Sequence, residues 1–547
     1  MRSRKWFFNL TVLKKNITRF APLWAIYGVI QILSKLTTVG VSYSGFDSTP
    51  AIMQLAFEIP AMASTNFAYA LICGAVLFGD LFRSRMCNSL YAMPMRREGW
   101  LLTNLVSGLL FSFVPNLLAA LLVLPMAQGL WAVPFLWLAA VTLQFLFFFG
   151  VAVLAAYCTG KRFAMVVVYF LINFFSMILY WMVESIYGVL LYGVVINADL
   201  PVALCPLIRM LDFEYLDLTY YAGKPVLTFG SVWGYTGVCA GVGLVLMGLS
   251  VLCCRRRNME CAGDFVVFQW LRPVLLVLFS LFSAMFLQLF AIPVLIGLAI
   301  GFFCAIMLLE RTVRVFRKKT FLGAAILLGV YMISLPLVEL DVFGIVRWLP
   351  KSQEVASVRV EVSGTELYLD APQEIQDILE IHSACIERWE ADKIEVDYYE
   401  YTADYVPVGL YYTTQLGTIR QRQYNIPAES AEGQLLQRYL SSPEAVLGDV
   451  LHSDTELMHI QWIKATDYSP IKDPGEMQSL LDAIIADCNA GKMAQPWVFQ
   501  RSMRTCDLEI VYYDKDHKLW TTHITVSEDC DNIIAWAKAR GIEIQWY

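Results

Sequence analysis

The sequence is poor in charged residues. Lys, Arg, Asp and Glu make up only 16% of the 547 residues, whereas hydrophobic residues make up 58%. Soluble domains contain about 25% charged and about 45–50% apolar residues. A soluble chain this apolar would need one very large core, and single cores stop growing near about 250–300 residues. The shortage of charge therefore excludes an ordinary soluble protein and indicates a chain that crosses a membrane several times.

Motifs that hold phosphate or carry out hydrolysis are missing as well. The chain has no G-x-x-x-x-G-K-[ST] loop, so it cannot hold ATP phosphates in that way. It also has no H-E-x-x-H metal motif and no G-x-S-x-G nucleophile motif. We therefore expect that this chain is not an enzyme and that it carries no catalytic, cofactor-binding or metal-binding residues of its own.

Charge is also divided unevenly along the chain. Residues 1–340 contain 24 Lys and Arg, 13 Asp and Glu, and no histidine. Residues 341–547 contain 17 Lys and Arg, 34 Asp and Glu, and all 5 histidines. This asymmetry predicts a membrane domain at 20–340 and an acidic, soluble domain at 341–547. An acidic domain without a basic patch argues against nucleic acid as a partner.

Apolar runs long enough to cross a bilayer recur through the first part of the chain. A spanning helix needs about 20 mostly apolar residues. Nine segments are predicted spans: 20–40, 62–82, 101–124, 133–158, 163–183, 229–254, 273–290, 292–309 and 320–339. The predicted fold class is a polytopic α-helical membrane protein with about nine transmembrane helices in the lipid bilayer. Residues 1–19 are predicted to form an amphipathic segment at the membrane surface, with an ordinary cytosolic extension as the alternative.

Lys and Arg are concentrated in alternate loops between these spans. One set of loops, which includes the N-terminal segment, carries 20 of them, whereas the opposite set carries only Arg209 and Lys224. Positively charged loops mark the cytoplasmic side, so the N-terminus is predicted to be cytoplasmic. An odd number of spans then places the C-terminal domain outside the cell membrane. The long outer loop 184–228 is predicted to be a lid over the helix ends, with a re-entrant segment as the alternative.

Beyond residue 350 the hydrophobic pattern changes to the alternation that is typical of strands. Val355–Val362 and Glu366–Asp370 predict paired strands followed by a helix near 372–391, and a similar order recurs near 506–540. The C-terminal domain is therefore predicted to be α+β with antiparallel sheets. Its four cysteines have spacings that name no disulfide framework, which leaves their pairing open: Cys385, Cys488, Cys506 and Cys530.

Ionisable residues are scarce inside the predicted spans. Lys35 lies near an outer end, and Asp80 and Arg272 lie near inner ends. Ion-coupled carriers usually keep carboxylates or histidines near the middle of the membrane. Their absence disfavours a secondary carrier and predicts that transport is driven by another subunit.

The loop between the second and third predicted spans carries the clearest functional signal. A short helix here would present apolar anchors between arginines, and such a helix suits docking into a groove of another protein. The alternative is a basic turn that only sets the topology. The predicted contact residues are Arg83, Arg85, Tyr91, Met93, Pro94, Arg96, Arg97 and Glu98.

Residues 90–98, Leu-Tyr-Ala-Met-Pro-Met-Arg-Arg-Glu, resemble the first intracellular loop of bacterial ABC-2 type transporter permeases. Residues 255–265 are similar to the basic stretch that follows the core of the same family. This second likeness adds Arg255, Arg256, Arg257 and Glu260 as a second predicted cytoplasmic contact. Residues 411–427 resemble the hairpin of an uncharacterised C-terminal domain found on permeases of Gram-positive bacteria. The family core has six spans, so the predicted count adds three.

The resemblance implies a permease subunit that forms a homodimer, or a heterodimer with a second permease. Residues 83–98 would then act as the coupling helix, which seats in a separate ATPase subunit that binds ATP and Mg²⁺. The family relationship also implies export. A membrane-anchored sensor whose outer domain binds a ligand remains the alternative function.

Overall fold

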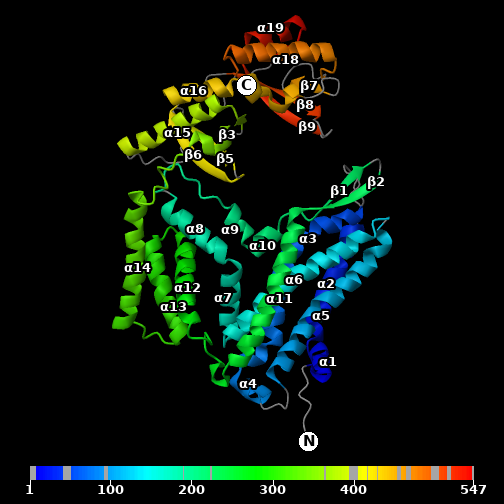
Figure 1. Cartoon of the computed structure of the whole chain (residues 1–547). Helices are drawn as coiled ribbons and strands as arrows, with labels where there is room; N and C mark the ends of the chain where they lie inside the picture. Colours follow the sequence, from blue (N-terminus) through cyan, green and yellow to red (C-terminus); the bar gives the residue numbers. More distant parts are fainter. Residues whose placement is uncertain are drawn as a thin grey trace. The chain divides into compact units, whose positions relative to one another are not determined.

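The chain folds into two compact units. The computed structural model describes residues 8–40, 51–91, 96–127, 129–188, 190–221, 224–362, 365–392, 405–415, 417–427, 429–452, 458–462, 470–493, 504–513 and 519–544. The helical unit comprises Met1–Ile186 and Ala198–Ser334, and the C-terminal unit comprises Tyr187–Asn197 and Leu335–Tyr547. Figure 1 traces the elements in chain order. The division lies near the expected boundary at residue 340, but the C-terminal unit also takes residues from the long loop after the fifth predicted span.

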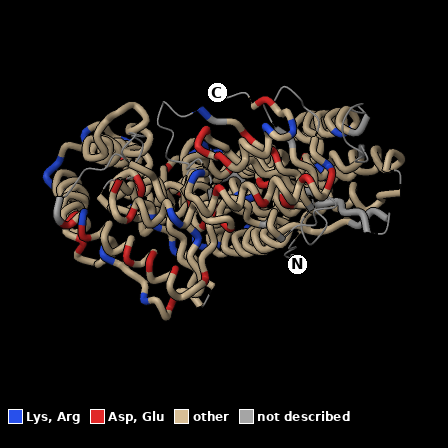
Figure 2. Tube along the Cα trace, turned by 90° about the horizontal axis from the view of Figure 1, so that it is seen from above, with Lys and Arg blue, Asp and Glu red and all other residues tan. Residues whose placement is uncertain are grey.

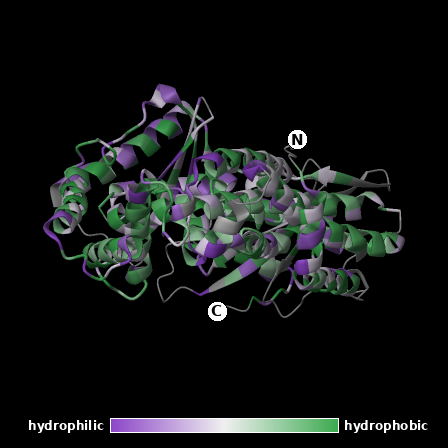
Figure 3. Ribbon diagram, turned by 90° about the horizontal axis from the view of Figure 1, so that it is seen from below, coloured by the Kyte–Doolittle hydropathy of each residue, from purple (hydrophilic) through white to green (hydrophobic). Residues whose placement is uncertain are grey.

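Apolar helices make up most of the helical unit, and Figure 3 shows hydrophobic colour along most of their length. Most of the trace is likewise uncharged in Figure 2. The longer helices are α2 (Ala21–Gly40), α3 (Gln54–Leu77), α5 (Arg97–Val123), α6 (Ala132–Cys158), α11 (Ser231–Arg256), α12 (Leu271–Gln288), α13 (Val294–Glu310) and α14 (Lys318–Glu339). The shorter helices are α1 (Leu10–Arg19), α4 (Ser84–Tyr91), α7 (Arg162–Asn173), α8 (Phe175–Tyr187), α9 (Asp199–Ala203) and α10 (Pro206–Met210). Four 3₁₀ turns and one antiparallel hairpin connect them: η1 (Ala51–Met53), η2 (Gly79–Phe82), η3 (Leu124–Met126), η4 (Met259–Cys261), β1 (Leu216–Tyr221) and β2 (Lys224–Phe229).

The described residues contain six to eight candidate spans. Six helices are long and apolar enough to cross a membrane: α3, α5, α6, α11, α12 and α14. Two more spans arise if each bent pair counts as one, namely α1 with α2 at 64° and α7 with α8 at 66°. Helix α13 has 17 residues and is shorter than the usual span. The fold is therefore multi-pass and helical, and the count of nine stays a prediction that depends on α13.

The N-terminal segment forms a helix of its own. Val12 and Ile17 pack against the core of the helical unit, whereas Lys14 and Lys15 are exposed, so α1 is amphipathic. Asn16 on the packed side is buried and bonds to α5. The surface location of this segment in a membrane stays a prediction.

Two antiparallel sheets, each packed against helices, build the C-terminal unit. The first sheet has the strand order β4-β3-β5-β6, and the second has the order β7-β8-β9. The elements of the first half are η5 (Ser352–Glu354), β3 (Val355–Val362), β4 (Thr365–Leu369), α15 (Pro372–Asp392), β5 (Tyr405–Thr414), β6 (Ile419–Pro427) and α16 (Ala431–Leu440). Those of the second half are α17 (Pro443–Leu447), η6 (Gly448–His452), β7 (His459–Trp462), α18 (Pro474–Asn489), β8 (Thr505–Tyr513), β9 (Leu519–Ser527) and α19 (Asp531–Ala539). The α+β pattern and the repeated strand, strand, helix order are confirmed.

Alternation in the strands creates the first of two cores. Val358, Val360 and Val362 of β3 are buried beneath α15 and α16, whereas Arg359 and Glu361 point to the other face and are half-buried. A separate core fills the space between the second sheet and α18 and α19. Hydrophobic residues at every second position of the strands thus bury one face of each sheet.

Tyr187–Asn197, which we call the strap, belongs to the C-terminal unit although it lies between α8 and α9 in the chain. The carbonyl oxygen of Gly193 accepts a hydrogen bond from the amide of Gln423 at 3.0 Å, and Val194 pairs with Arg422 in an antiparallel bridge. These residues complete the edge of a sheet, because an open edge strand leaves backbone groups unpaired. The expected lid over the helix ends stays a prediction.

Candidate functional site

The basic loops meet at one end of the helical unit. Helix α4 packs against η2 and η4, so the loop after α3 contacts the segment that follows α11. Gly160 bonds to that same segment through its amide, which donates to the carbonyl oxygen of Asp264 at 3.0 Å. Arg311, just after α13, forms an ion pair with Asp264. Figure 1 shows α4 and the loop after α11 at the same end of the unit.

Arg257 is the centre of this end, and its side chain is only 1% exposed. Its Nη1 donates to the carbonyl oxygens of Ala156 at 2.9 Å, Tyr157 at 3.0 Å and Thr159 at 2.9 Å. Its Nη2 donates to the carbonyl oxygen of Leu81 at 3.1 Å. The last carbonyls of a helix lack partners and carry partial negative charge, so a cation is favoured there. Arg257 therefore fastens the end of α6, the turn η2 and the segment after α11 to one another.

This placement corrects the expectation for Arg257, which was predicted to be a surface contact. It lies beneath the surface, whereas Arg255, Arg256 and Glu260 are exposed. Three arginines in a row look alike in sequence. Only the fold distinguishes the one that turns toward the helix end.

The two predicted contact segments form one surface. Arg255 donates from Nε to Oε1 of Glu98 at 3.0 Å, and Arg97 donates from Nη1 to the carbonyl oxygen of Arg257 at 3.3 Å. Glu98 is half-buried in the first turn of α5, where the helix dipole favours an acidic side chain. The start of α5 and the end of α11 are thus joined side by side.

Helix α4 turns one side inward and the other outward. Cys87 is fully buried, and burial raises the pKa of its thiol. Met86 on the outer side is 37% exposed. Tyr91 is the last residue of α4, and the predicted anchors Met93 and Pro94 lie outside the described residues. The exposed surface of this end, which we call the basic patch, consists of Arg83, Arg85, Met86, Arg96, Arg97, Arg255 and Arg256.

A buried ion pair elsewhere in the helical unit was missed by the sequence analysis. Lys35 of α2 is 2% exposed and pairs with Glu58 of α3, which also accepts a hydrogen bond from Thr38. The Lys35 Nζ lies 5.2 Å from the ring centre of Trp137. This carboxylate lies near the start of α3, so the expectation that no carboxylate sits near the middle of the membrane stays a prediction. The predicted span began at residue 62, but α3 begins at Gln54 and continues through Pro60.

Buried side-chain amides link other helices of this unit. Asn16 Nδ2 donates to Oδ1 of Asn104 at 2.7 Å, which ties α1 to α5. Asn66 Nδ2 donates to Oε1 of Gln144 at 3.0 Å, and Gln144 Nε2 donates to the Tyr215 hydroxyl at 2.9 Å. Such bonds hold helices together where the surroundings offer no water. We assign these residues to packing, because each side-chain amide nitrogen donates to another group of the protein, although Oδ1 of Asn66 is buried without a partner.

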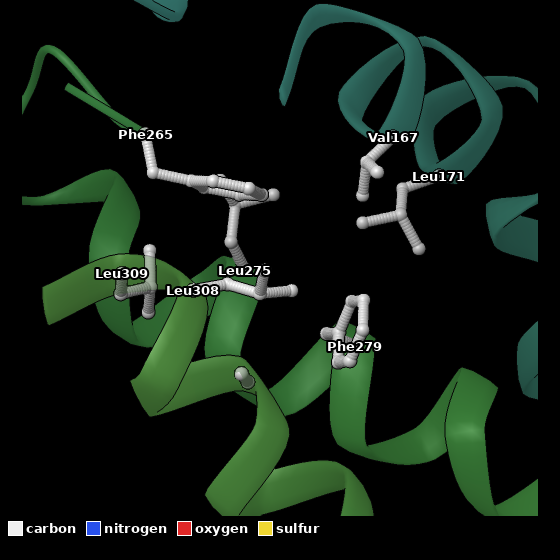
Figure 4. A pocket seen from close by; sticks show the side chains of 8 residues that line it. Val167, Leu171, Phe265, Leu275, Phe279, Leu308 and Leu309 are labelled. Atoms are coloured by element: carbon white, nitrogen blue, oxygen red, sulfur yellow. The ribbon is translucent and has the colours of Figure 1, made fainter. Parts of the chain in front are cut away.

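A small pocket lies among α7, α12 and α13. Figure 4 shows that the side chains pointing into it carry only carbon atoms. The lining residues are Val167, Leu171, Phe265, Leu275, Phe279, Ala305, Leu308 and Leu309. A site that orients a polar ligand needs a few convergent polar groups, and this lining supplies none. The pocket therefore suits hydrocarbon only.

Metal ligands do not gather in the described part of the chain, where no group of three His, Cys, Asp or Glu side chains is placed to hold an ion. All cysteines of the C-terminal unit are free thiols, including Cys385 and Cys530. Comparison with models of known protein families, with curated proteins and with solved structures finds no match to this chain. The functional argument therefore rests on the basic patch and its supports.

Proposed function

We propose that this chain is the membrane-spanning permease subunit of an ATP-driven transporter of the ABC-2 type. A separate ATPase subunit docks on the basic patch, and a second permease completes the transporter. The observation that carries the proposal is the contact of α4 and the start of α5 with the end of α11 and the segment after it, supported from below by Arg257. The absence of a phosphate-binding loop from the sequence is consistent with a motor on another chain.

The contacts beneath the basic patch connect it mechanically to the long helices. Helix α4 follows α3 through η2 and precedes α5 in the chain. Arg257 joins η2 to the end of α6 and to the segment after α11. A displacement of α4 therefore acts on four long helices together. ATP on the partner shifts the equilibrium between two arrangements of the bundle if the partner binds one arrangement more tightly.

Apolar anchors should dominate the affinity of this contact. Exposed ion pairs contribute only about 0–1 kcal/mol each. Side chains that become buried at the centre of an interface contribute far more, and aromatic residues are enriched among them. We therefore assign the main anchor to Tyr91 with Met86, and assign orientation to the surrounding arginines.

The proposal places the C-terminal unit outside the cell membrane. The strap follows α8 and belongs to that unit, and the chain enters the unit again after α14. The ends of α8 and α14 must then lie on one side, which requires an even number of crossings between them. Helices α11, α12, α13 and α14 supply four such crossings if α13 spans. This count supports nine spans and an orientation opposite to that of the basic patch.

The test is co-purification of the ATPase. Tyr91→Ala should remove the ATP-hydrolysing subunit from the protein isolated from its native membrane, because the main anchor is lost. Tyr368→Ala is the matched control, since it makes the same change at a side chain that is 69% exposed on the C-terminal unit. Both variants should elute and unfold like the parent chain. Full ATPase recovery with Tyr91→Ala would contradict the proposal.

A membrane-anchored sensor is the second candidate, and the strap is the observation that favours it. A segment from between two helices that is docked on a sheet of the C-terminal unit suits a protein that signals the state of that unit. ATP-dependent movement of solute in inverted membrane vesicles distinguishes the two functions. A permease requires it, whereas a sensor shows ligand binding without transport.

A further inference from the structure

The edge strand β6 is covered by the strap. On its other side β6 pairs with β5, so the strap supplies the neighbour that this edge would otherwise lack. The hydrogen bond from the Gln423 amide to the Gly193 carbonyl oxygen has a donor–acceptor distance of 3.0 Å. The strap is thus held by backbone pairing.

Aromatic packing reinforces this pairing. The ring of Tyr192 stacks on that of Trp389, with centroids 6.2 Å apart and planes 7° apart. The same ring lies 5.5 Å from that of Tyr424, which is 1% exposed. The strap therefore covers the aromatic end of the first core.

Gly193 permits this close approach. Its φ angle of +69° lies in the left-handed region, which glycine adopts without strain. A Cβ atom at this position would lie 2.0 Å from Cε1 of Tyr424. The strap backbone consequently rests directly on the ring, and any larger residue must displace one or the other.

A broken helix, α7 with α8, leads directly into the strap. Helix α8 ends at Tyr187, and α7 and α8 meet at a bend of 66°. Only Met177, Ile178 and Ile186 of α8 are buried among its described residues. Few contacts hold α8 in place, so its position depends strongly on what its two ends are attached to.

We propose that the strap is a transmission element through which the C-terminal unit controls the position of α8. The docked strap fixes the end of α8, and its release from β6 allows α8 to move about the bend. The regulatory part rests on the proposed function, because it assumes that the helical unit transports. The mechanical part does not depend on it.

The test is amide hydrogen exchange of the full chain in lipid nanodiscs. Gly193→Ala should speed exchange at least about tenfold in residues 190–197 and in α8, because both the strain and the collision oppose docking. Gly491→Ala is the matched control: its φ is +67°, but nothing lies within 4 Å of the added Cβ. It should leave the strap and α8 unchanged.

Two results would overturn the inference. The first is a released strap with unchanged exchange in α8, which would make the strap a passive cover. The second is unchanged exchange in the strap itself. If Gly193→Ala does not fold, Tyr192→Ala removes the stacking without backbone strain and should act in the same direction. An ATPase that is absent from the parent protein refutes the proposed function but leaves this exchange test intact.

Discussion

Arg257 in the helical unit and Asp487 in the C-terminal unit are buried charges of opposite sign, and each lies at a helix end. In the helical unit, the guanidinium of Arg257 donates to carbonyl oxygens at the end of α6. In the C-terminal unit, the fully buried carboxylate of Asp487 accepts from the start of α19, with Oδ2 2.9 Å from the Ile533 amide. Neither charge depends on a side-chain counter-ion for these bonds. Backbone groups at helix ends thus satisfy buried charge of either sign, provided that the cation meets the carbonyls and the anion meets the amides.

Removing the cation is expected to have the largest effect. Arg257→Met leaves buried carbonyls at the end of α6 and in η2 without their shared donor, so we expect a loss of about 3–5 kcal/mol of unfolding free energy. If the proposed ATPase docks on the basic patch, the loss should also detach it, because the patch loses its support. Thermal unfolding in detergent measures the first effect. Arg256→Met changes the exposed neighbour and should have little effect on stability; equal losses in the two variants would refute the structural role of Arg257.

Removing the buried carboxylate of Asp487 should reduce the unfolding free energy by a smaller amount. Asp487→Ala deletes acceptors for the Asn532 side chain and the Ile533 amide, and we expect a loss of about 2–3 kcal/mol confined to the C-terminal unit. Asp482→Ala, on the exposed side of the same helix, is the control. Hydrogen exchange should rise in α18 and α19 while the helical unit stays protected. A loss shared by both units would argue against two separately stabilised bodies.

Acid should weaken the C-terminal unit through His382, a smaller effect that depends on pH. This ring is fully buried, and Nδ1 lies 3.0 Å from the Tyr412 hydroxyl. Burial, assisted by the positive charge of Arg422, lowers the pKa of His382 from 6.5 to about 3. The surrounding Tyr424 and Cys385 remain neutral in this range, because burial raises the pKa of each side chain.

The direction of this pH dependence follows from the protonation of His382 in the folded and unfolded states. Unfolded His382 takes up a proton below about pH 6.5, whereas the folded ring stays neutral, so stability is complete above that pH and is lost as the pH falls toward 3. At pH 5 the loss amounts to about 2 kcal/mol. Unfolding measured between pH 5 and 8 should show this slope, and His382→Gln should flatten it. An unchanged slope in that variant would assign the acid sensitivity to other groups.

Much of the helical unit could be predicted from continuous apolar sequence. The span predicted at 133–158 matches α6, Ala132–Cys158, because no charge interrupts it. The span predicted at 62–82 begins too late, since Glu58 resembles a loop residue until Lys35 neutralises it. A charged residue whose partner lies far away in sequence can therefore stand inside a helix where a hydropathy profile predicts a loop.

The candidate site could be predicted only in part. The basic residues of the patch stand out in the sequence, and the structure joins their two segments through Glu98 and Arg255. The burial of Arg257 could not be predicted, because its partners are backbone carbonyls and any residue provides those. The strap was missed for a similar reason: Gly193 and Val194 pair through main-chain groups with a strand far along the chain.

The strap also has a consequence for biogenesis. A ribosome releases Val194 long before it makes Arg422, so the early segment waits without its neighbour while four more long helices are synthesised and inserted. In the proposed topology, the sheet can close around it only when the intervening chain has returned to the same face of the bilayer. A chain with one misplaced helix would then carry an unfinished sheet edge, so closure of this edge would depend on correct membrane insertion.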